Sequence, residues 1–308
     1  MIAAAVLAAL ATTCALAAWR LTFARWTWRA PRTAILLWQS LGVTWGLAST
    51  GALLAFALGP YGKGVVHGLA EFLAAFLASV GSSVRDPYDV VRLAALVAGL
   101  SLLAVLVALP LAAGAQTLRA RHRHRLLLAL VARDEPAVPG VRVVDFPGAA
   151  AYCLPGLKSQ VVISDGTLHL LSSAELEAVL AHEAAHVRER HDLVLLPFAA
   201  LRRALPWSKL VRDAQASVEL LIEMAADDRA RRRCCPRRLA TALLRFGTSA
   251  SLPTPQGALG ASASSGVMAR VDRLVRPEVA LPPAQRFLIL TGSVLLATSA
   301  PLLWLLPG

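Results

Sequence analysis

The hydrophobic positions of this chain fall into four long apolar runs, three within its first 116 residues and one near its end. About 20 consecutive apolar residues are enough to cross the hydrocarbon core of a bilayer as a helix. The first run has no basic residues before it and arginines after it, which favours a retained helix over a cleaved signal peptide. The pattern therefore predicts four transmembrane helices, at about residues 2–19, 33–58, 90–116 and 287–306.

Between the third and fourth runs the pattern changes to shorter apolar segments separated by polar turns. Runs such as 151–156 and 160–166 predict short strands, and amphipathic runs after them predict helices. We therefore expect a membrane α-helical protein with an inserted α+β domain. The expected layout is three spans with an outer loop at 59–89 in residues 1–116, the inserted domain at 117–284, and the last span in 285–308.

Composition supports a membrane protein, and charge orients it. Hydrophobic residues make up 56% of the chain and charged residues only 16%, unlike an ordinary soluble domain. Arginines follow the first and third runs, which places the inserted domain in the cytoplasm and both termini outside the plasma membrane. The net charge of +12 indicates attraction to anionic lipid, because no nucleic-acid-binding motif accompanies the basic clusters. We expect the lipid bilayer, and no nucleic acid, as a partner.

His182, Glu183 and His186 form an H-E-x-x-H motif in a segment of helical pattern. On a helix, residues four apart lie one turn above each other, so both imidazole rings can bind a single Zn²⁺ ion. A catalytic zinc ion activates water, and Glu183 is placed to take the proton and pass it to the leaving amine. Ser172 or Ser173, followed by Glu175, predicts the start of this helix. The motif indicates a zinc metallopeptidase, the alternative being a structural pair of histidines.

A catalytic zinc site needs a third protein ligand, and the residues just after the motif are poor candidates. Glu189 lies about 10 Å along the helix from His182, too far to share the ion. His191 falls on the opposite face of that helix. A turn that would return Asp192 to the metal needs a glycine where this chain has Glu189, so we expect the helix to continue.

A later helical segment is the better source of the third ligand. It carries Glu219, Glu223 and Asp227 at four-residue intervals, so one face of the helix is acidic. If this helix crosses the first one, Glu223 completes the zinc site and Asp227 accepts a hydrogen bond from a ligand histidine. The alternative interpretation is an acidic stripe exposed to solvent.

The H-E-x-x-H motif, Asp192 and the E-x-x-A-D run that starts at Glu223 together resemble the gluzincin domain of two families of membrane metallopeptidases, M56 and M48. The two strand-like segments before the motif resemble the hairpin that precedes the zinc helix in these families. The resemblance implies zinc ligands at His182, His186 and Glu223, a general base at Glu183, and supporting residues at Asp227 and Asp192.

The resemblance also implies how a substrate is held. In these families the edge strand of the hairpin pairs with an extended polypeptide. Tyr152 and Cys153 lie on the matching segment here. Tyr152, or an arginine such as Arg229, is a candidate to stabilise the oxyanion that forms during hydrolysis.

Three spans before the motif and one after it resemble the M56 arrangement, whereas HtpX-like M48 proteins have two before and two after. We therefore expect a signalling protease that cleaves a BlaI-like winged-helix repressor in the cytoplasm. Self-cleavage within the Ser-, Gly-, Ala- and Pro-rich segment 249–265 is left open, and the favoured alternative is that this segment is an inert linker. The last run reaches almost to Gly308, so we expect no penicillin-binding sensor domain. The alternatives are an HtpX-like quality-control protease and a non-catalytic, zinc-containing receptor or scaffold. The oligomeric state is left open, a homodimer included.

Overall fold

The computed structural model describes residues 1–61, 64–78, 87–134, 141–154, 160–248, 259–260, 266–276 and 279–305. The chain forms two compact units, which are described separately. The first comprises residues 1–24, 36–109 and 282–308, and the second comprises residues 25–35 and 110–281.

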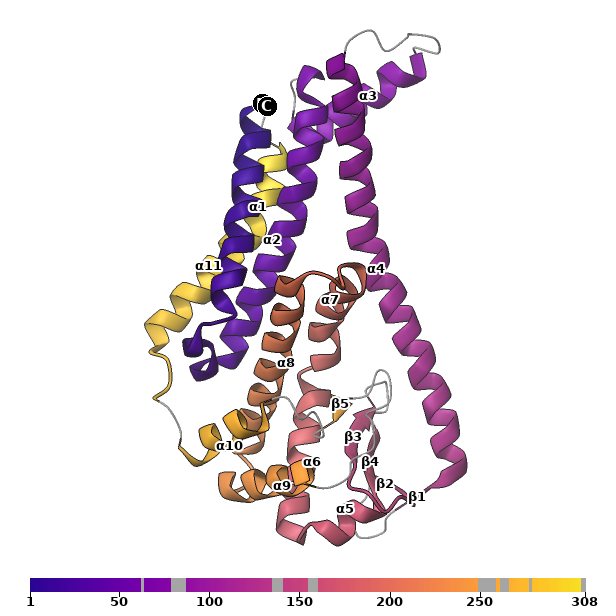
Figure 1. Ribbon diagram of the computed structural model, residues 1–308, viewed down its shortest axis with the longest axis vertical. Coiled ribbons are helices and arrows are strands. Elements are labelled where there is room, and N and C mark those ends of the chain that lie inside the picture. Colours follow the sequence, from indigo (N-terminus) through magenta and orange to yellow (C-terminus); the bar gives the residue numbers. More distant parts are fainter. Residues whose placement is uncertain are drawn as a thin grey trace. The chain divides into compact units, whose positions relative to one another are not determined.

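The described residues include four long apolar helices, as the sequence predicts (Figure 1). By length and composition each of them can cross a membrane. The third is longer than expected, because the predicted span and the basic segment after it form one continuous helix with Pro110 inside. A shorter apolar helix, α3 (Gly64–Ala78), lies in the predicted outer loop. The four long helices are α1 (Ile2–Leu21), α2 (Pro31–Ala57), α4 (Pro87–Val131) and α11 (Pro283–Leu305).

Small residues allow α1, α2 and α11 to pack closely in the first unit (Figure 1). Ala11, Ala48 and Ala300, one from each helix, are buried in a common cluster. A Cβ atom on Gly51 would clash with the indole ring of Trp304, so the glycine is required where the two helices meet. Close approach through small side chains is typical of helices that associate in membranes.

The second unit contains a mixed sheet in the strand order β1-β2-β4-β3-β5. Strands β2 and β4 are parallel, and the other neighbours are antiparallel. The predicted hairpin is confirmed, with Cys153 of β3 opposite Val161 of β4. Most of the Ser-, Gly-, Ala- and Pro-rich segment 249–265 lies outside the described residues, but its residues 259–260 pair with β3. The strands are β1 (Ala132–Asp134), β2 (Val141–Val144), β3 (Ala151–Leu154), β4 (Gln160–Ser164) and β5 (Leu259–Gly260).

The two faces of the sheet pack against different helices. Ala151 and Ile163 share a buried cluster with Val179 of helix α6 (Ser173–Arg188). Tyr152 and Leu154, which alternate with Ala151 and Cys153 along β3, pack on the other side with residues that include Leu128 of α4. Because successive side chains of a strand point to opposite faces, Cys153 faces the same side as Ala151, toward α6.

Helix α6 begins as predicted and ends earlier than predicted. The Ser172 backbone N–H and hydroxyl both donate to the Glu175 carboxylate, at 2.8 and 2.7 Å, so the Glu175 side chain caps the start of the helix. The helix stops at Arg188 because Arg190 adopts a left-handed conformation, with φ of 50°. Our prediction that the helix continues through this segment is wrong. The next helix, α7 (His191–Ala204), starts directly after this turn.

The remaining helices complete the second unit around α6 (Figure 1). Ser208 caps the start of helix α8, because its hydroxyl accepts a hydrogen bond from the Val211 N–H at 3.4 Å. Helices α9 and α10 pack on α6 and α8 through Leu239, Leu243 and Leu274, which are buried together with Ala178 and Ala230. These helices are α5 (Asp165–Leu170), α8 (Lys209–Ala230), α9 (Pro236–Thr248) and α10 (Val267–Val275).

Candidate active site

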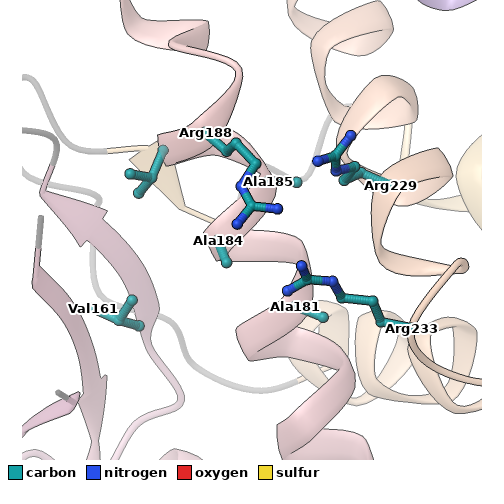
Figure 2. Close-up of a pocket in the computed structure, with 8 residues that line it drawn as sticks. Val161, Ala181, Ala184, Ala185, Arg188, Arg229 and Arg233 are labelled. Carbon is teal, nitrogen blue, oxygen red and sulfur yellow. The ribbon is translucent and has the colours of Figure 1, made fainter.

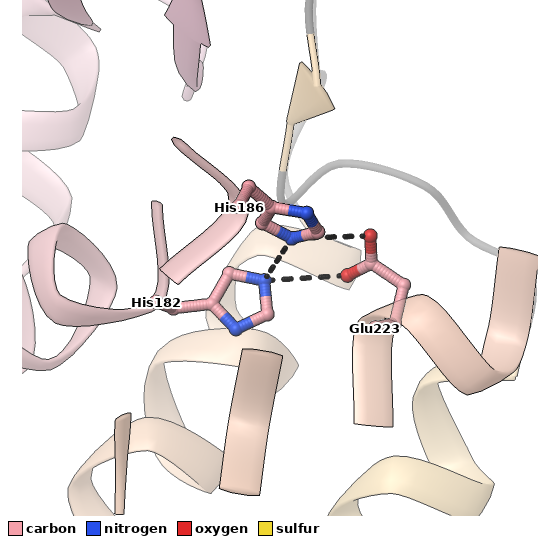
Figure 3. A group of neighbouring side chains, drawn as sticks. All are labelled: His182, His186 and Glu223. Atoms are coloured by element: carbon pink, nitrogen blue, oxygen red, sulfur yellow. Dashed lines mark hydrogen bonds and ion pairs between the residues drawn. The ribbon is translucent and has the colours of Figure 1, made fainter. Parts of the chain in front are cut away.

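Helices α6 and α8 bring His182, His186 and Glu223 together in the interior of the second unit (Figure 3). The two Nε2 atoms lie 3.1 Å apart. The Glu223 carboxylate oxygens lie 3.3 Å from Nε2 of His182 and 3.4 Å from Nε2 of His186. Tetrahedral zinc with bonds of about 2.0–2.1 Å places its ligand atoms about 3.3 Å apart. The three side chains therefore fit one zinc ion and would hold it together.

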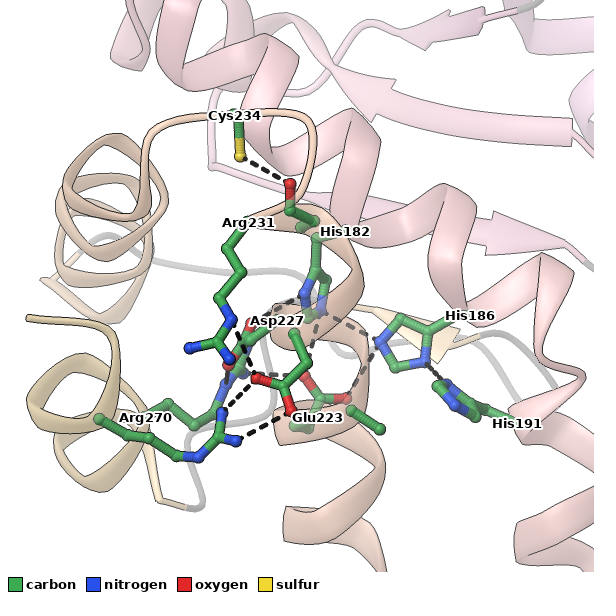
Figure 4. Close-up of polar contacts among 12 residues, drawn as sticks. His182, His186, His191, Glu223, Asp227, Arg231, Cys234 and Arg270 are labelled. Atoms are coloured by element: carbon green, nitrogen blue, oxygen red, sulfur yellow. Dashed lines mark hydrogen bonds and ion pairs between the residues drawn. The ribbon is translucent and has the colours of Figure 1, made fainter. Parts of the chain in front are cut away.

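Each histidine has a partner on its other ring nitrogen (Figure 4). Nδ1 of His182 lies 2.9 Å from Asp227 Oδ1, the partner that the sequence analysis proposes. Nδ1 of His186 lies 3.0 Å from Nδ1 of His191. Partners of this kind fix the tautomer and the orientation of ligand rings. The prediction that His191 faces away from the site is wrong, because the left-handed turn at Arg190 returns the chain toward α6.

Asp192 is not brought to either ligand histidine. Its carboxylate pairs with Arg121 of α4 at 2.9 Å and is almost fully buried. Glu189 is also placed away from the metal ligands and pairs with Arg32 at 2.6 Å. Its Oε2 atom lies 3.6 Å from Nε2 of His191. Asp192 therefore connects α7 to α4, and Glu189 belongs to the surroundings of His191.

Arg270 is a residue of this site that sequence reasoning missed. Its guanidinium, contributed by α10, is fully buried. It donates two hydrogen bonds of 2.8 Å to the Asp227 carboxylate and lies 2.8 Å from Oε2 of Glu223 (Figure 4). One cation thus holds both the expected ligand carboxylate and the carboxylate that supports His182. A buried charge needs such partners to be tolerated.

The electrostatics of the ligands follow from burial and from these partners. Burial disfavours a charged ring, but contacts with Asp227 and Glu223 overcome it and raise the pKa of His182 to about 9. Burial lowers the pKa of His186 to about 3, because its carboxylate contacts are weaker and cationic neighbours oppose its protonation. Burial also opposes ionisation of Glu223, yet Arg270 and the two histidines lower its pKa to about 2. Glu223 is therefore an ionised ligand.

The remaining candidates occupy different positions. Glu183 is fully buried on α6. Burial, followed by the negative charge of Glu183, raises the pKa of the Cys153 thiol, so Cys153 is a neutral group within electrostatic range of that carboxylate. The Tyr152 hydroxyl lies 2.9 Å from His124 of α4, on the other face of the sheet. Arg229 lines a groove beside α6. Glu183 is thus buried on the helix that carries two of the ligands, whereas Tyr152 contacts His124 and Arg229 borders the groove.

Comparisons with known proteins agree with this geometry. Residues 89–225 match the model of peptidase family M48, a segment that contains His182, Glu183, His186 and Glu223. The segment that carries the candidate zinc site is therefore similar to the zinc metallopeptidases of family M48. A "Protease HtpX homolog" of Aeropyrum pernix is 37% identical to this chain over 78 residues, which are 23% of this chain and 24% of that protein. The chain thus matches about a quarter of the length of this relative. No solved structure matched.

Proposed function

We propose that this protein is an integral membrane endopeptidase of the HtpX-like type that hydrolyses polypeptides with the help of one zinc ion. The observation that carries the proposal is the group of His182, His186 and Glu223, whose ligand atoms lie 3.1 to 3.4 Å apart beside the buried Glu183. In a structural zinc site, protein ligands occupy all four positions of the metal, so such a site has no need of a base such as Glu183. This argues against a non-catalytic receptor.

The residues of the chain divide the chemistry among them. When bound, zinc would supply a Lewis acid that polarises the peptide carbonyl and acidifies water. Glu183 accepts the proton of the attacking water and returns it to the amine that leaves. Asp227 and His191 keep the rings of His182 and His186 oriented, and both are buried with the site, so the ring positions are fixed before substrate arrives.

Strand β3 is the element on which we propose that substrate lies. An extended polypeptide can add to a free strand edge through main-chain hydrogen bonds. In the structure, β5 already pairs with β3 opposite Tyr152 and Cys153. A substrate that reaches these positions therefore has to displace Leu259 and Gly260 or extend the sheet beside them. The remainder of 249–265 lies outside the described residues.

The membrane arrangement is part of the proposal. Within the described part of the chain, four helices are long and apolar enough to span a membrane. The arginines that follow the first and third runs support an inserted domain, at 117–284, on the cytoplasmic side of the plasma membrane with both termini outside. Cysteines introduced at Lys63 and Arg125 test this orientation in intact cells. A membrane-impermeant reagent should label position 63 and leave position 125 unmodified, and the opposite pattern contradicts the orientation.

The test of the activity uses the full chain purified in detergent, with unfolded casein as a substrate without sequence preference. Hydrolysis should be present with zinc, disappear when 1,10-phenanthroline removes the metal, and return when zinc is added after the chelator is washed out. Hydrolysis that continues in the zinc-depleted protein contradicts the proposal. So does a zinc-loaded protein that cleaves neither casein nor any other unfolded protein supplied to it.

A second candidate function is signalling by cleavage of a BlaI-like winged-helix repressor. The order of the long apolar helices favours it, because three precede the zinc-binding helices and one follows them. Incubating the protein with casein and with a purified repressor of this class separates the two functions. One defined cut in the repressor and an intact casein favour signalling, whereas degradation of both favours quality control.

A further inference from the structure

A groove of about 340 Å³ runs beside the exposed side of α6, in the same unit as the zinc ligands (Figure 2). Its floor is formed by small side chains, Ala181, Ala184 and Ala185, with Val161 of β4 at one border. Ala181 and Ala185 directly precede His182 and His186 in the chain. Because successive helical residues are turned by about 100°, the groove and the metal ligands lie on adjoining faces of one helix.

Three arginines border this groove, and Figure 2 shows their guanidinium groups gathered around the alanines of α6. Arg188 comes from the end of α6, Arg229 from α8, and Arg233 from the turn that follows α8. None of the residues that line the groove is acidic. Three cations are therefore directed at one space with small apolar walls.

Nearby arginines outside the groove are paired with carboxylates. Arg273 lies 2.8 Å and Arg231 lies 3.3 Å from Asp228. Within the described residues, the three arginines of the groove have no side-chain hydrogen bond or ion pair of this kind. Glu189, whose pKa Arg229 helps to lower, is already held by Arg32 at 2.6 Å. The positive charge of the groove is thus left for a ligand from outside the described chain.

We propose that this groove binds an acidic segment of the polypeptide substrate. This deepens the proposed peptidase function and rests on it. Guanidinium groups bind carboxylates through charge-assisted hydrogen bonds, and the alanine floor lets an extended main chain approach the helix. A ligand held here is anchored on α6, the helix that carries Glu183. The groove therefore selects substrates that carry acidic residues away from the scissile bond.

Charge complementarity favours a polypeptide over the other anionic ligands. Binding of single-stranded nucleic acid combines basic side chains with aromatic rings on which bases stack, and none of the lining residues is aromatic. A membrane surface attracts basic clusters without requiring a recess. A recess with small walls and cations on its border fits a chain of carboxylate-bearing residues.

Binding of two labelled peptides to the full chain in phosphatidylcholine nanodiscs tests the proposal. One peptide carries several glutamates, and the other has glutamine at the same positions. The protein carries Glu183→Gln so that cleavage does not interfere. We expect the acidic peptide to bind about tenfold more tightly at low salt, a difference of about 1.4 kcal/mol. In Arg229→Gln/Arg233→Gln this preference should disappear. Arg232→Gln, an exposed neighbour outside the groove lining, is the matched control and should keep it.

The outcomes separate this inference from the peptidase function, because peptide binding is measured without hydrolysis. Equal binding of the two peptides overturns the acidic-segment proposal even if casein is cleaved. So does a preference that survives in the double variant. Nanodiscs that contain phosphatidylserine supply the competing source of anions. If the groove arginines interact with the phosphatidylserine headgroups and the protein binds neither peptide, the groove is a lipid site and the proposal is wrong. Zinc content and the thermal midpoint should match wild type in all variants.

Discussion

Replacing Arg270 with methionine should destabilise the second unit strongly. Methionine keeps much of the apolar stem of the arginine and removes the guanidinium, which makes three contacts of 2.8 Å with Asp227 and Glu223. Arg270 and Asp227 are almost completely buried, so water cannot replace the lost cation without opening the core. Removing one partner of a buried ion pair costs about 3–5 kcal/mol. In a unit of about 150–250 residues this lowers the melting temperature by roughly 6 to 20 °C.

The assay is differential scanning fluorimetry of the purified full chain, with zinc and after chelation. Bound zinc compensates the charge of Glu223. The fall in melting temperature should therefore lie near the lower end of this range with zinc and near its upper end without zinc. Arg276→Met is the matched control at the end of the same helix, since its side chain is 84% exposed and lies 3.9 Å from Asp272. It should cost less than about 1 kcal/mol. Equal melting temperatures for the two variants would refute the role assigned to Arg270.

Three further predictions concern the metal ligands and their surroundings. Glu223→Ala should abolish stoichiometric zinc binding measured by mass spectrometry, while Glu219→Ala, one helical turn away, should retain it; the reverse result moves the third ligand to Glu219. In the metal-free protein His182 has a raised pKa of about 9, so its charged form adds stability that is complete below pH about 6.5 and is lost as pH rises toward 9. Zinc binding displaces this proton, so the apparent zinc affinity should rise with pH over the same window, by up to about tenfold per pH unit. Competition titrations measure this affinity, and an affinity that is independent of pH contradicts the assignment of the raised pKa to His182. Tyr152→Phe should leave kcat for casein unchanged and cost about 1 kcal/mol of stability through loss of the contact with His124. A fall in kcat of a hundredfold or more, with zinc retained, would restore Tyr152 as an oxyanion donor.

The parts of this site that follow from spacing within one helix could be predicted from the sequence. His182 and His186 are four residues apart, as are Glu223 and Asp227, so each pair occupies one helical face wherever the helix lies. The four apolar helices could be predicted in the same way, because the thickness of the bilayer sets the length of an apolar run that spans it. In both cases a local regularity carries the structural information.

The contribution of Arg270 could not be predicted from spacing. It lies 43 residues after Asp227 and meets it only through the packing of α10. One signal was nevertheless present. Arg270 stands three residues after Val267 and four before Leu274, both of which pack in the core, so the arginine occupies the apolar face of an amphipathic helix. A charged residue at such a position indicates a buried partner.

The position of His191 was missed for a different reason. Chain reversals of this kind usually involve glycine, which adopts positive φ without steric cost. Here Arg190 adopts φ of 50°, and nothing in its residue type indicates that conformation. Extending the helical pattern past Arg190 therefore placed His191 on the wrong side of the helix.

The central claim is that His182, His186 and Glu223 hold a catalytic zinc ion for which Glu183 is the base. Its most direct test is Glu183→Gln, in which zinc content and casein hydrolysis are measured on the same preparation. Glutamine has the size of glutamate and cannot accept the proton, so we expect one zinc ion per chain, as in wild type, and hydrolysis reduced by a factor of at least about 10². Retained zinc together with unchanged hydrolysis would contradict the account.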